Sequence, residues 1–210
     1  MKTEVVFILD RSGSMSGLEK DTIGGFNSMI AQQKEGVGEA TVTTILFDHE
    51  IKILHNRQLI QDVATLTAEQ YTTRGSTALL DAIGYSVQLT EKAQQQLPLG
   101  ERAQNIIFII TTDGEENSSS QHSVESIRKL VSKQKELGWE FIFLGANIDA
   151  ISTAKQFGLS ADDAVDYIAD EVGTLKIYSM VDEVVGSIRK EGKRKQNWKA
   201  EIEKDYKLRK

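Results

Sequence analysis

The sequence predicts an α/β protein with a doubly wound, mostly parallel central sheet, one antiparallel edge strand and helices on both faces. Short apolar runs rich in β-branched residues alternate with segments of helical periodicity along the whole chain. Two of these runs, Thr41–Phe47 and Ile51–Leu54, are separated by only three residues, which indicates a hairpin and hence the antiparallel edge. Polar clusters follow two predicted strands, at the place where open α/β sheets bind their ligands.

The first element is a buried parallel strand at Val5–Leu9, because all five residues are apolar. A helix over residues 17–34 follows, with apolar residues at helical spacing and glycines at its end. The hairpin comes next, with its turn at Asp48-His49-Glu50. Residues 56–76 show no clear period, and the sequence predicts no regular element there.

A second helix is predicted from Thr77 to a point before Pro98, with Leu80, Ile83 and Val87 on one face. The fully apolar run Ile106–Ile110 is the candidate for the centre of the sheet. Caps and apolar patterns predict the remaining elements. These are a helix from Ser123 to Gly138, a strand at Phe141–Leu144, a short helix at 149–157, a short strand at 164–168, and a closing helix through Ile177, Val181, Val184, Val185 and Ile188.

Length and composition indicate one globular domain, assigned to residues 1–190, followed by a tail at residues 191–210. The chain has no Cys, which excludes disulfides, zinc–thiolate sites and thiol catalysis. Its apolar runs are far shorter than a membrane span. The first strand begins close to Met1 and leaves no room for a signal peptide, so we expect a cytoplasmic location.

Charge is distributed unevenly along the chain. The net charge is −6, but residues 189–210 hold ten Lys or Arg against four acidic residues, which leaves −12 on the rest. An acidic body repels phosphate, which argues against a nucleic-acid partner. In the tail, Trp198, Ile202 and Tyr206 recur at helical spacing among basic residues. This basic amphipathic segment either packs on its own domain, stays partly disordered, or contacts an acidic partner.

The segment Asp10-Arg11-Ser12-Gly13-Ser14 directly follows the first strand. Asp10, Ser12 and Ser14 alternate along a glycine-containing loop, which brings three oxygens around one point. Clustered hard oxygens suit a hard divalent cation such as Mg²⁺. The segment after the first strand therefore predicts one part of a metal site.

Two later segments complete a known pattern: Arg74-Gly75-Ser76-Thr77 opens the second helix, and Thr111-Thr112-Asp113-Gly114 follows the central strand. With these the chain resembles the von Willebrand factor A (vWA) domain family and its metal-ion-dependent adhesion site (MIDAS) over about residues 4–190. The resemblance implies a complete set of metal ligands, which would be Asp10, Ser12, Ser14, Thr77 and Asp113. The ion would be Mg²⁺ or Mn²⁺, with Ca²⁺ also compatible.

The same resemblance implies that the chain is not an enzyme but a binding module. Neutral hydroxyl ligands leave the cation under-compensated, so an Asp or Glu carboxylate of a partner protein would complete its coordination. The chain is most similar to stand-alone bacterial or phage-type members that act as adaptors. Two alternatives stay open: a Mg²⁺-dependent phosphatase or hydrolase that uses Asp10 and Asp113, and a structural subunit whose metal serves stability only.

Acidic residues near these motifs allow two interpretations each. Asp81 lies one helical turn after Thr77. It either orients the hydroxyl of Thr77 or is an acidic residue in the first turn that the helix dipole favours. Glu115, Glu116 and Asn117 either line the rim of the site or form a solvated loop.

The remaining polar candidates are two histidines and two loop residues. His49 and His122 are interpreted as surface histidines, because neither has a partner at ligand spacing. Arg11 and Met15 are expected to be exposed loop side chains, either in contact with a ligand or without a role.

Overall fold

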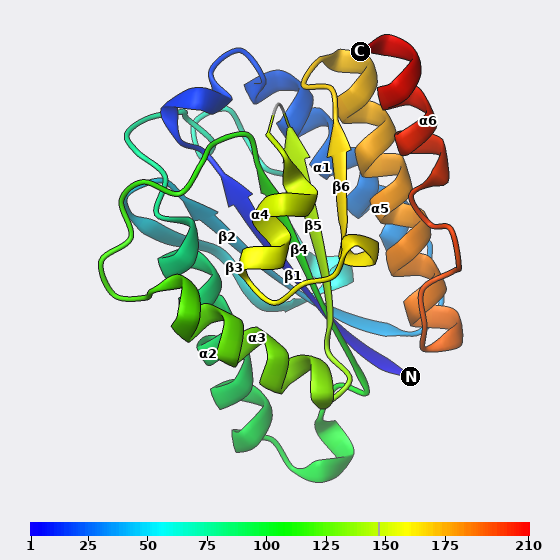
Figure 1. Ribbon diagram of the computed structural model, residues 1–210. Helices are drawn as coiled ribbons and strands as arrows, with labels where there is room; N and C mark the ends of the chain where they lie inside the picture. Colours follow the sequence, from blue (N-terminus) through cyan, green and yellow to red (C-terminus); the bar gives the residue numbers. More distant parts are fainter. Residues whose placement is uncertain (147) are drawn as a thin grey trace.

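The computed structural model describes residues 1–146 and 148–210. Within them, six strands form one sheet in the order β3-β2-β1-β4-β5-β6 (Figure 1). Neighbouring strands are parallel except β2 and β3, so the predicted doubly wound sheet with one antiparallel edge is confirmed. The strands are β1 (Lys2–Asp10), β2 (Glu39–Phe47), β3 (Ile51–Leu59), β4 (Asn105–Thr112), β5 (Glu140–Ala146) and β6 (Ala164–Tyr167).

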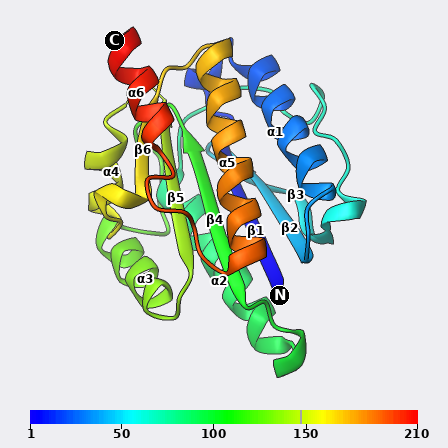
Figure 2. The same cartoon turned by 90° about the vertical axis from the view of Figure 1, so that its right-hand side faces the viewer.

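Helices cover both faces of the sheet (Figures 1 and 2). One face carries α1 (Glu19–Lys34), α5 (Glu171–Glu191) and α6 (Ala200–Arg209). The other carries α2 (Leu79–Gln96), α3 (Val124–Glu136) and α4 (Ala150–Gln156). Single 3₁₀ turns occur at Gly13–Met15, Ile60–Asp62, Leu99–Glu101 and Ala161–Asp163.

Strand β1 shows how the sequence pattern builds two cores. Its odd-numbered residues from Val5 to Leu9 pack with α1 and α5, and Val6 and Ile8 pack with α2 and α3. Successive side chains of a strand point to opposite faces, so a strand buried on both faces must be apolar throughout. By the same alternation, Asp10 shares the face of Val6 and Ile8, which is the face that α2 covers.

Several predicted boundaries differ from the structure. Strand β3 continues to Leu59, because an edge strand needs no apolar alternation and His55 instead bonds Thr44 on β2 (Nδ1–Oγ1 3.0 Å). Helix α1 begins at Glu19 and α2 at Leu79, each two residues later than expected. Residues 56–76, for which the sequence predicts no regular element, are mostly irregular after the end of β3. They nevertheless place Val63, Leu66 and Tyr71 in the core between the sheet, α1 and α5.

The tail lies against β6 and α5 of its own domain. Its one buried apolar side chain is Ile202, and the Trp198 Nε1–H donates to the Asp162 carbonyl (3.0 Å). Arg194 forms an ion pair with Asp163 (2.6 Å). Trp198 precedes α6 rather than belonging to it, so the helical spacing predicted from the sequence is only partly present. No helix of the described residues is long and apolar enough to cross a membrane.

Candidate metal centre

The carboxyl ends of β1 and β4 bring the two predicted acidic ligands together. Asp10 is the last residue of β1, and Asp113 directly follows β4. The two strands are neighbours, and the order of the sheet reverses between them, which is the position where doubly wound sheets form ligand crevices. The fold therefore places the two acidic motifs of the sequence at this position, at the ends of β1 and β4.

Gly114 shows how closely the three predicted hydroxyl ligands converge. A Cβ added at Gly114 would lie 2.9 Å from Ser14 Oγ, 3.0 Å from Thr77 Oγ1 and 3.6 Å from Ser12 Oγ. The Ser14 hydroxyl donates to Asp113 Oδ1 (2.6 Å), and the Oγ atoms of Ser12 and Ser14 are 3.0 Å apart. The structure thus brings these residues to one place. We call Asp10, Ser12, Ser14, Thr77 and Asp113 the oxygen cluster.

Asp10 forms the buried floor of the oxygen cluster. Its Oδ1 accepts the Ser12 backbone N–H (2.7 Å), and its Oδ2 accepts the Thr112 hydroxyl (2.6 Å). Burial raises the pKa of Asp10 to about 6, although both hydrogen bonds oppose the shift. A carboxylate that is removed from water without a counter-charge is destabilised in its ionised form.

Asp113 has the same electrostatic character. Burial also raises its pKa, and the hydrogen bond from Ser14 opposes the shift. Among the described residues, neither Asp10 nor Asp113 has an ion-pair partner within 4.0 Å. Ser14 is exposed, so the oxygen cluster reaches solvent on that side. Two uncompensated carboxylates and three hydroxyls fit a hard divalent cation.

The segment after Asp113 fixes the position of Thr77. The Thr77 N–H donates to Asn117 Oδ1 (2.9 Å), and the Asn117 N–H donates to the Thr77 carbonyl (3.1 Å). Glu116 Oε2 accepts the N–H of Leu80 (2.9 Å) in the first turn of α2. Glu116 is thus a structural residue, which contradicts both interpretations for it, whereas Glu115 and Asn117 are exposed in the loop and their interpretations as rim or solvated loop stay open.

Asp81 does not orient the hydroxyl of Thr77. Its carboxylate accepts the backbone N–H groups of Ser120 (2.8 Å), Gln121 (3.0 Å) and His122 (2.8 Å). Burial acts in the opposite direction, but these donors hold the pKa of Asp81 below its usual range. Asp81 lies in the first turn of α2, as the second interpretation expected, and it anchors the approach to α3.

The two histidines differ in exposure. The side chain of His49 is half-exposed in the β2–β3 turn, as predicted. The side chain of His122 is only 15% exposed, with Nδ1 3.2 Å from Asp81 Oδ1, so its interpretation as a surface residue was wrong. Its ring lies so close to α2 that a Cβ at Gly84 would be 2.5 Å from Nε2.

Arg11 and Met15 are buried, which contradicts the prediction of exposed loop side chains. Arg11 Nε lies 3.1 Å from Asp48 Oδ2, and Arg74 Nε lies 2.9 Å from the same oxygen. Ligand atoms of Asp48, His49 and Glu50 lie within 4.8 Å of one another. We assign no ion to that turn, because two guanidinium groups already neutralise Asp48.

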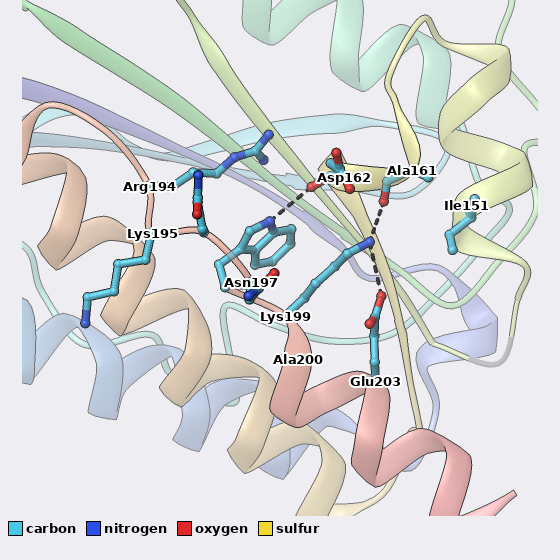
Figure 3. A pocket seen from close by; sticks show the side chains of 11 residues that line it. Ile151, Ala161, Asp162, Arg194, Lys195, Asn197, Lys199, Ala200 and Glu203 are labelled. Carbon is cyan, nitrogen blue, oxygen red and sulfur yellow. Dashed lines mark hydrogen bonds and ion pairs between the residues drawn. The ribbon is translucent and has the colours of Figure 1, made fainter.

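A cavity of about 630 Å³ lies beside the tail (Figure 3). Its central cation, Lys199, donates to the carbonyls of Ala161 and Ala164 and lies 3.2 Å from Glu203. Arg194 at the same cavity is paired with Asp163. These cations are satisfied within the chain, so the cavity offers less binding chemistry than the oxygen cluster.

Two residues that contact the oxygen cluster were missed in the sequence. Thr112 binds the Asp10 carboxylate, and the Tyr71 hydroxyl donates to the Asp10 carbonyl. Thr112 had a local signal, since it is a polar residue at the end of an apolar strand beside Asp113. Tyr71 had none, because it lies in the connection without periodicity.

Comparisons with known proteins agree on the fold. The family model described as von Willebrand factor type A domain matches residues 4–181. No curated protein matches the chain in sequence. Solved structures do match in fold. The vWF domain of the pilus tip protein Mfa5 from Porphyromonas gingivalis shares 11% identity at a TM-score of 0.63, over 86% of this chain and 95% of that one.

Two further structures have the same fold at low identity. The SpRpn10 VWA domain gives 13% identity and a TM-score of 0.58, over 86% of this chain and 95% of that one. Proximal thread matrix protein 1 from the mussel byssus, with a zinc-occupied MIDAS motif, gives 14% and 0.59. This match covers 88% of our chain but only 46% of the mussel protein. Such identities show the fold alone. The match to the family model extends over most of the sequence, so the chain belongs to the von Willebrand factor type A domain family.

Proposed function

We propose that this chain binds a partner protein through a divalent cation held by Asp10, Ser12, Ser14, Thr77 and Asp113. A carboxylate of the partner would complete the coordination. VWA domains mediate protein–protein interactions and are typically not enzymes. That family property supports the general class of function, and the oxygen cluster supports the specific site.

The observation that carries the proposal is the convergence of three hydroxyls beside two unpaired carboxylates. The hydroxyl oxygens of Ser12, Ser14 and Thr77 all lie within 4 Å of one point, next to Asp113. Mg²⁺ requires oxygen ligands in near-octahedral geometry. Mn²⁺ accepts the same donors, and Ca²⁺ is also compatible. The bound ion would supply a positive charge that attracts a carboxylate from solvent.

The exposure of the cluster residues explains why the ligand that completes the coordination of the ion would come from a partner. Ser12 and Thr77 are buried, whereas Ser14 is exposed, so the oxygen cluster is open on one side only. Asp10 and Asp113 would repel a carboxylate in the metal-free protein, so the carboxylate of a partner would bind only together with the ion. Partner binding should therefore depend on the metal.

A capture experiment from native lysate tests this proposal. Wild type, Asp10→Ala and Thr77→Ala would be used as bait, each with Mg²⁺ and with EDTA. Asp62→Ala is the matched control, because Asp62 is an exposed acid outside the oxygen cluster. We expect a partner only with wild type and Asp62→Ala, and only with Mg²⁺. A partner that is retained in EDTA and by Thr77→Ala would contradict the proposal.

The other predicted functions give different results. Phosphate-ester turnover that disappears in Asp10→Ala would favour a hydrolase. A metal that raises the melting temperature without affecting any partner would favour a structural role. Contact between the tail and an acidic partner is not included in our proposal, because Arg194 and Arg209 pair with acids of the chain itself. The adaptor role and the cytoplasmic location remain predictions, the latter to be tested by cell fractionation.

A further inference from the structure

We propose that Tyr71 is a positioning residue of the metal centre, whose hydroxyl holds the Asp10–Ser14 turn against the segment that carries Thr77. The inference rests on the proposed function, since it concerns the geometry of the same ligands. Tyr71 touches no predicted ligand atom itself and would act through the backbone of Asp10.

Tyr71 is buried directly beneath the metal-binding turn. Its side chain is 1% exposed, and its hydroxyl donates to the carbonyl oxygen of Asp10. That carbonyl belongs to the peptide group between Asp10 and Arg11, where the chain leaves β1 and turns toward Ser12. The hydrogen bond therefore fixes the first peptide plane of the turn. The N–H of the same peptide group, from Arg11, donates to the Phe47 carbonyl (2.8 Å), and without Tyr71 the buried Asp10 carbonyl would carry the cost of a lost donor.

Two backbone hydrogen bonds join the same pair of segments. The Arg74 N–H donates to the Arg11 carbonyl (2.9 Å), and the Gly13 N–H donates to the Gly75 carbonyl (3.1 Å). Gly75 has φ +68°, a conformation that favours glycine, and a Cβ there would lie 2.2 Å from His49 Nδ1. Tyr71 thus adds a side-chain bond to a contact that already runs from Arg11 to Gly13.

This contact controls how the two halves of the oxygen cluster meet. Ser12 and Ser14 come from one segment and Thr77 from the other, so their mutual distances depend on the contact between the segments. Mg²⁺ requires oxygen ligands at about 2.0–2.1 Å in a near-octahedral arrangement, whereas Ca²⁺ accepts longer distances and irregular geometry. Loss of the Tyr71 hydroxyl should therefore weaken Mg²⁺ binding more than Ca²⁺ binding.

Tyr178 provides a matched control for Tyr71. It is also buried (4% exposed), lies in the same core, and packs its ring against Gly25 of α1. Among the described residues its hydroxyl has no hydrogen-bond partner. Tyr178→Phe removes the same atom as Tyr71→Phe without breaking a bond to Asp10.

The test is a calorimetric titration of the metal-free protein with MgCl₂ and, separately, with CaCl₂. Wild type, Tyr71→Phe and Tyr178→Phe would be compared, and thermal unfolding in EDTA would report stability without metal. For Tyr71→Phe we expect Mg²⁺ affinity to fall about tenfold, as is typical when a group that supports a metal ligand is removed. Its Ca²⁺ affinity should change less than the Mg²⁺ affinity, and Tyr178→Phe should match wild type for both ions.

The outcomes separate this inference from the function on which it rests. If Tyr71→Phe binds both ions like wild type, or loses stability in EDTA while the ratio of Mg²⁺ to Ca²⁺ affinity stays unchanged, Tyr71 is an ordinary core residue. The metal centre itself would then stand. If wild type binds neither ion, the proposed function fails first and the inference with it.

Discussion

Two buried aspartates show how differently this chain treats negative charge. Asp10 in the oxygen cluster and Asp163 beside the tail are both almost inaccessible to solvent. Burial raises the pKa of Asp10 to about 6. For Asp163, burial acts in the same direction, but hydrogen bonds from Lys135, Ser160 and Arg194 outweigh it and lower the pKa to about 2.

The difference lies in the partners of each carboxylate. Asp163 has two cations of the chain within ion-pair distance. One is Lys135, and the other is Arg194, whose Nη2 lies 2.6 Å from Asp163 Oδ1. Among the described residues, Asp10 receives hydrogen bonds from a backbone N–H and a neutral hydroxyl and from no cation. A buried carboxylate with cations of its own has its charge satisfied by folding, whereas one without them remains available to a ligand. This contrast supports our proposal that the oxygen cluster, rather than the basic tail, is the binding site.

The largest expected effect concerns the compensated aspartate. Asp163→Asn leaves Lys135 and Arg194 without their shared counter-charge, and we expect the free energy of unfolding to fall by about 3 kcal/mol. Urea unfolding measures this change. The matched control is Asp162→Asn, since Asp162 is exposed and contributes only its backbone carbonyl to Trp198. Equal stability of the two variants would remove the contrast between the two regions.

Asp10→Asn, unlike Asp163→Asn, should not lower the stability of the metal-free protein, because it removes a buried charge without a partner. Mg²⁺ at a hundred times its Kd should stabilise wild type by about 2.7 kcal/mol, and Asp10→Asn should lose this gain. Urea unfolding of both proteins in Mg²⁺ and in EDTA measures it. A Mg²⁺-dependent gain that survives in Asp10→Asn would show that the ion binds elsewhere.

Acid titration sharpens the same contrast with a smaller effect. The folded-state pKa of Asp163 is about 2, below the usual unfolded value of about 3.9. Its contribution to stability is therefore complete above pH 4 and is lost as the pH falls toward 2. In EDTA, wild type should lose more stability over this range than Asp163→Asn. Parallel curves for the two proteins would show that the carboxylate is not held by its cations.

The smallest effect belongs to the exposed ion pairs of the tail. Arg209 is paired with Asp170 and Asp205 at the surface. Such pairs contribute little to stability and are screened by salt. Arg209→Ala should therefore lower the melting temperature slightly at low salt and not at all at high salt. Lys207→Ala, a change at an exposed lysine outside these pairs, is the control. A large loss at high salt would mean that the tail is held by more than charge.

Much of the candidate site could be predicted from the sequence, because its signals are local. Asp10, Ser12 and Ser14 lie within one turn after an apolar strand, and Asp113 follows another strand directly. Strands β1 and β4 were recognisable since burial on both faces demands apolar residues throughout. Strand β3 was predicted too short because an edge strand tolerates polar residues.

The residues that support the site could not be predicted, because their partners are distant in the chain. Tyr71 contacts Asp10 across 61 residues, and Thr112 does so across 102. Arg11 was expected to be exposed as a charged loop residue, yet Asp48 from the next hairpin pairs with it in the interior. A local pattern indicates what a residue can bind, and only the fold decides which residue it meets.

The most direct test of this account is titration of the metal-free protein with Mn²⁺, followed by electron paramagnetic resonance. Wild type should bind one ion per chain at the oxygen cluster. Asp10→Asn and Thr77→Ala should abolish that binding while they remain folded, and Asp163→Asn should retain it if folded. Absence of binding by wild type, or equal binding by Asp10→Asn, would contradict the claim that the uncompensated carboxylates form the metal centre.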